Sequence, residues 1–116
     1  MKTKHFDKTI DKKLTCLCCP DKDVLPEVYL VLELIRNHFN QPVIITSGYR
    51  CIKYNKSIGG RSQSQHMKRT AVDIVVKNIS AKIVHDFLDN LFPNSLGLGY
   101  YPDFIHVDIR SRKSRW

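Results

Sequence analysis

Residues 71–76 read Ala-Val-Asp-Ile-Val-Val, and this run is the strongest indication of the fold. Five of its six side chains are apolar, and Val and Ile favour strands, so the run predicts a buried strand. Asp73 interrupts the run with a carboxylate, which is costly to bury without a partner. A metal ion is one such partner, so the same strand also indicates a candidate functional site.

Upstream of this strand, the sequence predicts a helix and a second strand. Apolar residues on one helical face, preceded by the capping residue Asp23, predict a helix that ends near Asn40. Residues 43–46 form a short β-branched run, which predicts a buried strand. Residues 1–22 have no sustained periodicity. We therefore expect them to form an N-terminal arm that leads into one domain spanning residues 23–116.

Downstream, the sequence predicts a second helix and a hairpin. Ser80 caps an amphipathic helical stretch. Residues 96–101 and 104–109 predict two strands, with Pro102 and Asp103 as the turn between them. The order of elements predicts a small α+β domain, in which helices pack on one face of a mainly antiparallel sheet.

Composition limits the class of protein and its partners. With 42% hydrophobic and 26% charged residues in 116, the chain is typical of one small globular domain. Its net charge of +8 favours polyanionic partners such as nucleic acid, anionic lipid or a cell-wall polymer. No recognised nucleic-acid motif accompanies that charge, so we expect no specific nucleic-acid partner. No apolar run is long enough for a signal peptide or a membrane span, so we expect cytoplasmic synthesis and no membrane insertion.

Four cysteines allow more than one interpretation. Cys16 and Cys19 have the C-x-x-C spacing of a structural zinc knuckle, and Cys18 and Cys51 could complete four thiolates. A second C-x-x-C pair is absent, however, and a disulfide to Cys51 would require an oxidising environment. The sequence alone therefore favours small, partly buried free thiols.

His66, Asp73 and His106 are candidate metal ligands. His66 precedes Asp73 by seven residues, and His106 lies among apolar residues of the last predicted strand. Two imidazoles and one carboxylate are typical of a catalytic zinc site that leaves a fourth position for water. Each residue taken singly is more typical of a structural, hydrogen-bonded side chain than of a metal ligand, and no H-E-x-x-H helix is present. Spacing alone leaves both interpretations open.

Three blocks of sequence, which occur in a fixed order, favour the metal-site interpretation over the structural one. They are Ser47-Gly48-Tyr49-Arg50 with Tyr54-Asn55, Ser64-Gln65-His66 with Ala71-Val72-Asp73-Ile74, and Gly97-Leu98-Gly99-Tyr100-Tyr101-Pro102 with His106-Val107-Asp108. Together they resemble the M15 metallopeptidase family, which includes D-alanyl-D-alanine carboxypeptidases and phage endolysins that cut L-alanyl-D-glutamate bonds. Hedgehog signalling domains have a similar zinc-containing fold.

The resemblance implies a role for each of these positions. It implies that Zn²⁺ is the cofactor, bound by His66, Asp73 and His106. It implies that Arg50 steadies the oxyanion or a substrate carboxylate, a task that suits an always-charged guanidinium. Ser64 and Gln65 are candidates for contacts with the peptide groups of the substrate.

The general base has two candidates. Asp103 lies three residues before His106, as in the D/E-x-x-H arrangement of several branches of the family, and a turn allows its side chain to be re-aimed. Asp108 lies two residues after His106, so strand alternation places both side chains on the same face. We favour Asp103, because a shared face equally suits a carboxylate that only supports His106.

Arg69 departs from the family pattern, which has Gly three residues after the first zinc-binding His. If this position requires a positive φ, Arg is strained there. Alternatively, the Arg69 side chain could reach toward substrate.

The expected function is zinc-dependent hydrolysis of peptidoglycan stem-peptide bonds by a monomer, either as a carboxypeptidase or as an endopeptidase. The resemblance to endolysins implies action on the cell wall after release or as a virion component. A metal-containing binding module of the same fold, without catalysis, is the alternative.

Overall fold

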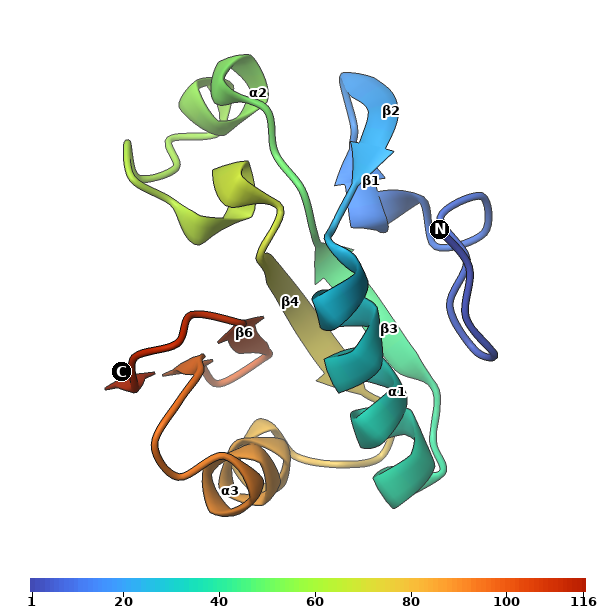
Figure 1. Cartoon of the computed structure of the whole chain (residues 1–116), viewed down its shortest axis with the longest axis vertical. Coiled ribbons are helices and arrows are strands. Elements are labelled where there is room, and N and C mark those ends of the chain that lie inside the picture. The colour runs from blue at the N-terminus through green and yellow to red at the C-terminus, as the bar shows by residue number, and fades with distance from the viewer.

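Strand β4 (Ala71–Val76) is the buried apolar strand that the sequence predicts, and it lies between β3 and β6. The structure, a computed structural model, describes residues 1–116 and contains a five-stranded sheet in the order β3-β4-β6-β5-β7 (Figure 1). The other four strands are β3 (Val43–Ser47), β6 (Ile105–Asp108), β5 (Gly97–Tyr100) and β7 (Ser114–Arg115). All neighbouring pairs are antiparallel except β5 and β7, which confirms the predicted mainly antiparallel sheet.

The two main helices are α1 (Pro26–Phe39) and α3 (Ala81–Leu91). Pro26 begins α1, since its fixed φ suits the first turn of a helix, and Asn40 ends it in the left-handed conformation. The predicted cap at Asp23 is wrong: the N-cap is Leu25, and the Asp23 carboxylate instead accepts a hydrogen bond from the Tyr29 hydroxyl. Ser80 caps α3 as predicted, because its Oγ accepts from the Ile83 amide at 3.3 Å.

The two faces of the sheet carry different residues because side chains alternate along a strand. Val72, Ile74 and Val76 belong to the core, which includes buried residues of both helices such as Leu32 and Leu88. Figure 1 shows α1 along β3 and α3 near the ends of β5 and β6. The helices thus pack on one face, as predicted. The opposite face carries the polar residues of β4 and β6.

The N-terminal segment contributes to the core. It contains a short 3₁₀ helix, η1 (Lys12–Leu14), and a hairpin of β1 (Thr15–Cys16) and β2 (Cys19–Asp23). Phe6 and Leu14 are buried in the same hydrophobic cluster as the helices. The boundary of the arm at residue 22 stays a prediction.

Two short helices complete the fold, α2 (Ile52–Ser57) and the 3₁₀ helix η2 (Gln65–Lys68). Both belong to the connection from β3 to β4, and they lie on either side of its polar loop at residues 58–64. None of the helices combines the length and the apolar character needed to cross a bilayer, and the longest, α1, has 14 residues.

Candidate metal centre

Three side chains converge on the polar face of the sheet, each from a different element. Asp73 on β4 lies directly opposite His106 on β6, and His66 enters from η2. The Asp73 Oδ1 atom lies 3.0 Å from His106 Nδ1 and 3.3 Å from His66 Nε2. One ligand atom from each residue lies within 4.8 Å of the other two, and each residue is less than a tenth exposed. The predicted ligand residues are therefore brought together.

The remaining nitrogen of each imidazole has a fixed partner. His66 Nδ1 lies 2.7 Å from the Gly48 carbonyl oxygen, which can only accept, so Nδ1 carries the proton and Nε2 is left free to bind a metal. His106 Nε2 lies 2.9 Å from Asp108 Oδ2, which directs Nδ1 toward Asp73 in the same way. Metal-binding imidazoles are typically oriented by such acceptors. The donor set and its orientation fit a divalent cation.

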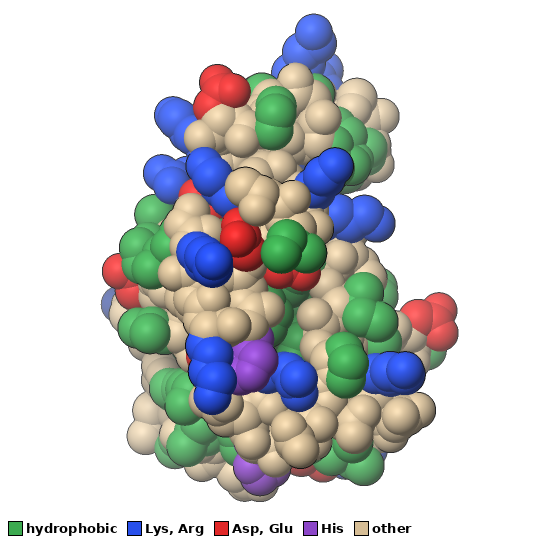
Figure 2. Space-filling view, turned by 90° about the vertical axis from the view of Figure 1, so that its right-hand side faces the viewer, with side chains coloured by type: hydrophobic (Ala, Val, Ile, Leu, Met, Phe, Trp, Pro, Cys, Tyr) green, Lys and Arg blue, Asp and Glu red, His purple; other side chains and the backbone are tan.

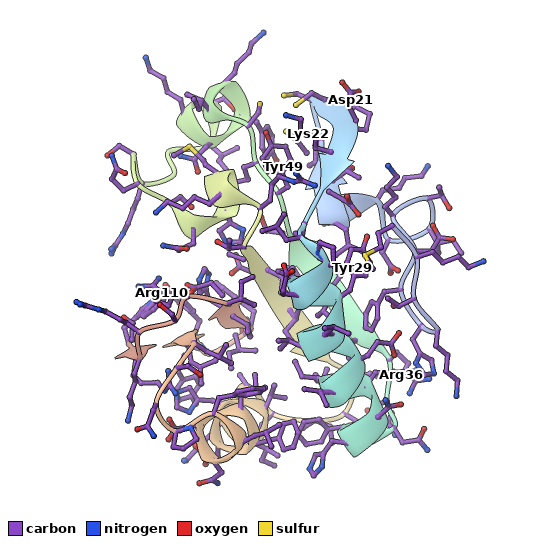
Figure 3. All side chains as sticks on the ribbon, in the orientation of Figure 1. Asp21, Lys22, Tyr29, Arg36, Tyr49 and Arg110 are labelled. Carbon is purple, nitrogen blue, oxygen red and sulfur yellow. The ribbon has the colours of Figure 1, made fainter.

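Asp108 is held rigidly beneath His106. Its side chain is fully buried, and Arg110 donates to both of its oxygens at 2.7 Å, from Nε and Nη2 (Figure 3 labels Arg110). A Cβ atom on Gly97, the neighbouring residue on β5, would lie 2.3 Å from Asp108 Oδ2, so only glycine leaves room for this carboxylate. Burial raises the pKa of Asp108, but the hydrogen bonds from His106 and Arg110 outweigh it and lower the pKa. Asp108 is thus an ionised acceptor for the His106 proton.

The ligand carboxylate is also ionised. Burial raises the pKa of Asp73, but the hydrogen bonds and charges of His106 and His66 lower it to about 2. Burial lowers the pKa of His106, but its contacts with Asp108 and Asp73 outweigh burial and raise it. Two anionic carboxylates, Asp73 and Asp108, therefore flank the His106 imidazole. A bound cation would compensate their negative charge.

Arg50 is positioned beside this cluster by polar contacts. Its Nε donates to Ser47 Oγ at 3.1 Å, Nη1 donates to Asn55 Oδ1 at 3.2 Å, and Nη2 lies 3.6 Å from Asp73 Oδ2. Asn55 is buried and donates to the Arg61 carbonyl oxygen, and a Cβ on Gly60 would lie 2.1 Å from Asn55 Oδ1. The loop after α2 therefore orients the Arg50 guanidinium.

A cleft of about 700 Å³ opens over the cluster. It is lined by Arg50, Gly59, Gly60, Arg61, Gln63, Ser64, Gln65, His66, Asp73, Tyr101, Phe104, His106, Arg110, Ser114 and Trp116. Asp73 is the only carboxylate among these residues, whereas three of them are arginines. The cleft therefore suits a ligand that carries negative charge.

The predicted substrate-binding residues Ser64 and Gln65 line the cleft, but both side chains already have protein partners. Ser64 Oγ accepts from the His66 amide at 3.2 Å and caps η2. Gln65 Oε1 accepts from the Thr70 hydroxyl at 2.9 Å. Their predicted contacts with substrate stay a prediction.

Neither candidate general base faces the cleft. Asp103 is exposed in the turn between β5 and β6 and lines a separate, mostly apolar pocket with Ile74 and Val76. Asp108 shares a face with His106, as strand alternation predicts, but it is buried and occupied by Arg110. The choice between them stays a prediction.

Arg69 adopts the left-handed conformation that its position in the family pattern suggested, with φ 64°. Its Nε donates to the Asp23 carbonyl oxygen at 2.6 Å, and its Nη2 lies 3.9 Å from an Asp23 carboxylate oxygen. The side chain therefore binds the N-terminal segment and does not line the cleft.

Sequence reasoning missed several residues of the site. Trp116 lies with its ring centroid 5.1 Å from that of His106, and its Nε1 donates to the Tyr101 hydroxyl at 3.0 Å. The Gly48 carbonyl is a backbone group, so no side-chain pattern identifies it. Arg110 lies two residues beyond the end of β6, and its nearness to Asp108 in the sequence is the signal that could have identified it.

Comparison with known proteins agrees with this geometry. No curated protein matches the chain. The profile of the family described as Peptidase M15 matches residues 1–108, which include all three candidate ligands and Asp108. This protein therefore belongs to the peptidase M15 family and is a metallopeptidase by family.

Proposed function

We propose that this protein is a zinc-dependent peptidase that hydrolyses stem-peptide bonds of peptidoglycan. The convergence of His66 Nε2, an Asp73 oxygen and His106 Nδ1 in an open cleft supports this proposal most directly. Two nitrogens and one oxygen leave a tetrahedral zinc ion with one free position. When bound there, zinc would supply Lewis-acid polarisation of the scissile carbonyl and activation of water.

The protein's own groups would bind and orient the substrate. Arg50 is held by Ser47 and Asn55, so little rearrangement is needed for its guanidinium to bind negative charge in the cleft. Arg61, whose side chain has no hydrogen-bonding partner in the protein, lines the same cleft. Stem peptides carry free carboxylates, which suit these two arginines.

The net charge of +8 supports a polyanionic wall as the larger target. On the face shown in Figure 2, Lys and Arg side chains are dispersed among acidic and hydrophobic ones and do not form one continuous stripe. A dispersed basic charge favours general attraction to an anionic wall over recognition of a nucleic acid. We extend the proposal to a monomer that reaches the wall after release or as a virion component.

Digestion of purified peptidoglycan tests the proposal. The zinc-loaded protein should release fragments in an assay read by mass spectrometry, and a chelator should abolish their release. Loss of a single alanine would identify a carboxypeptidase, and internal cleavage an endopeptidase. The variant His66→Ala serves as the inactive control. Zinc-loaded protein that yields no chelator-sensitive product would contradict the proposal.

A metal-containing binding module is the second candidate, and one observation favours it: neither Asp103 nor Asp108 faces the cleft. The variants Asp103→Asn and Asp108→Asn separate the two functions. If the wild type and both variants bind zinc and wall fragments but none cleaves them, the binding module is the function.

A further inference from the structure

The four cysteines of the chain form a second cluster, away from the cleft. Cys16 and Cys19 face each other across the β1–β2 hairpin, Cys18 lies in its turn, and Cys51 is the N-cap of α2. One sulfur from each residue lies within 4.8 Å of the other three. Figure 3 shows sulfur atoms in yellow between the hairpin and α2.

We propose that Cys16, Cys18, Cys19 and Cys51 bind a structural zinc ion as four thiolates. Zinc bonded to four sulfurs at about 2.3 Å places those sulfurs about 3.8 Å apart, at the corners of a tetrahedron. The Sγ atom of Cys18 lies 3.6 Å from that of Cys16, 3.9 Å from that of Cys19 and 3.2 Å from that of Cys51. These distances lie close to the tetrahedral edge.

The fold supplies what the sequence pattern lacks. A structural site normally uses two C-x-x-C pairs, and this chain has one. The second pair is assembled in space, because the turn brings Cys18 near the start of α2, where Cys51 lies 33 residues away in the sequence. Four sulfurs close the coordination sphere, which is the property of a structural rather than a catalytic site.

Backbone amides point at two of the sulfurs. The Cys51 amide donates to Cys16 Sγ at 3.4 Å, and the Tyr54 amide donates to Cys51 Sγ at 3.3 Å. Such bonds favour the thiolate form that binds metal. Four adjacent thiolates would repel one another without a cation, so each thiol would release its proton to solvent as the metal binds.

A disulfide is the competing explanation, and the geometry favours it less. A disulfide joins sulfurs in pairs, whereas Cys18 Sγ is within 3.9 Å of all three of the others. Two disulfides would use all four sulfurs but only as separate pairs, which does not account for the approach of Cys18 Sγ to three sulfurs. A metal uses all four equally.

The zinc would link the N-terminal hairpin to the segment that carries Arg50. Cys51 directly follows Arg50, and the Arg50 amide donates to the His66 carbonyl oxygen at 3.2 Å. A zinc ion bound there would therefore fix the position of Cys51, and with it Arg50, relative to the N-terminal hairpin. It would not contact substrate. Its existence is independent of the proposed peptidase activity.

Metal analysis of the full-length protein, purified with a thiol reductant and without added metal, tests this site. The variant His66→Ala/His106→Ala removes the ligands of the cleft and should retain one zinc per chain. Titration of its thiols with an organomercurial should release that zinc as the cysteines react, detected with a zinc-sensitive dye. Cobalt exchanged into this variant should give the intense sulfur-to-metal charge-transfer absorption of a four-thiolate site.

Cys18→Ser in the same His-free background should lose the zinc. The matched control is Leu17→Ser, which changes the neighbouring exposed residue of the same turn and should keep it. The cobalt and mercurial measurements do not depend on whether the cysteine variant folds. No zinc in the His-free variant, iron in its place, or a mass showing two hydrogens lost to a disulfide would each overturn the proposal.

Discussion

Strand β4 is buried on both faces, but different parts of the protein cover them. Val72, Ile74 and Val76 on one face pack against helices, and their contribution is removal of apolar area from water. Asp73 on the other face is surrounded by imidazoles and a guanidinium. Because side chains alternate along a strand, neighbouring residues serve stability and chemistry separately. Substitutions on the two faces should therefore have separable effects.

The largest expected effect is on activity. Replacing Asp73 with Ala removes the ligand that both imidazoles approach, and metal-assisted stabilisation of a transition state is worth several kcal/mol. We expect zinc to be lost from the cleft and peptidoglycan cleavage to fall by about a thousandfold or more. Metal content and cleavage rate are measured on the same sample, with circular dichroism to verify folding. Full activity in Asp73→Ala would contradict the assignment of this face.

A substitution on the apolar face of β4 should reduce stability and leave activity nearly unchanged. Ile74→Ala leaves a cavity in the core and should lower the free energy of unfolding by about 2–5 kcal/mol. The cleavage rate per folded molecule, measured well below the unfolding transition, should stay near that of the wild type. Urea unfolding and activity assays test the two statements. A large loss of activity in the folded variant would show that the faces are coupled.

Substitution of Asp108 tests how much this hydrogen-bond partner of His106 contributes to zinc affinity and activity. Asp108→Asn keeps the shape but weakens the acceptor for the His106 proton, so zinc affinity or activity should fall by about 10- to 100-fold. The control is Asp103→Asn, on the exposed turn, which should change neither if Asp103 does not reach the cleft. Competition with a chelator measures the affinity. Loss of cleavage only in Asp103→Asn, with zinc affinity intact, would instead support Asp103 as the general base.

The pH dependence of stability tests Asp73 in the metal-free protein. Its pKa is about 2 in the folded state against an ordinary value of 3.8, so its ionised form stabilises the fold above pH 4. That stabilisation, about 2 kcal/mol, should be lost as the pH falls from about 4 to 2. Urea unfolding at pH 5, 4, 3 and 2 should show a smaller loss in Asp73→Asn than in the wild type. If the unfolding free energies of the wild type and Asp73→Asn change equally with pH, the lowered pKa of Asp73 is contradicted.

The sequence allowed prediction of features that depend on local periodicity. The alternation of β6 correctly placed His106 and Asp108 on one face, and Ser80 was correctly identified as a cap. The cap at Asp23 was wrong because Asp23 ends strand β2, and its carboxylate accepts hydrogen bonds from the Tyr29 hydroxyl and the N-terminal amine. The C-x-x-C spacing of Cys16 and Cys19 indicated a possible metal site, but the approach of Cys51 to Cys18 is a contact between distant residues that no local spacing reveals. The Gly48 carbonyl and the burial of Asp108 are likewise properties of the folded chain.

The smallest expected effect concerns Arg69, which lies between the metal centre and the N-terminal segment. Its left-handed backbone costs a non-glycine residue about 1–2 kcal/mol, whereas its side-chain bonds to Asp23 return a similar amount. Arg69→Gly should therefore leave stability nearly unchanged, because it relieves the strain and loses the bonds. Arg69→Ala loses the bonds and keeps the strain, so it should be less stable than Arg69→Gly by about 1 kcal/mol. Equal unfolding free energies for the two variants would mean that the backbone at residue 69 is not strained, and both should retain zinc in the cleft.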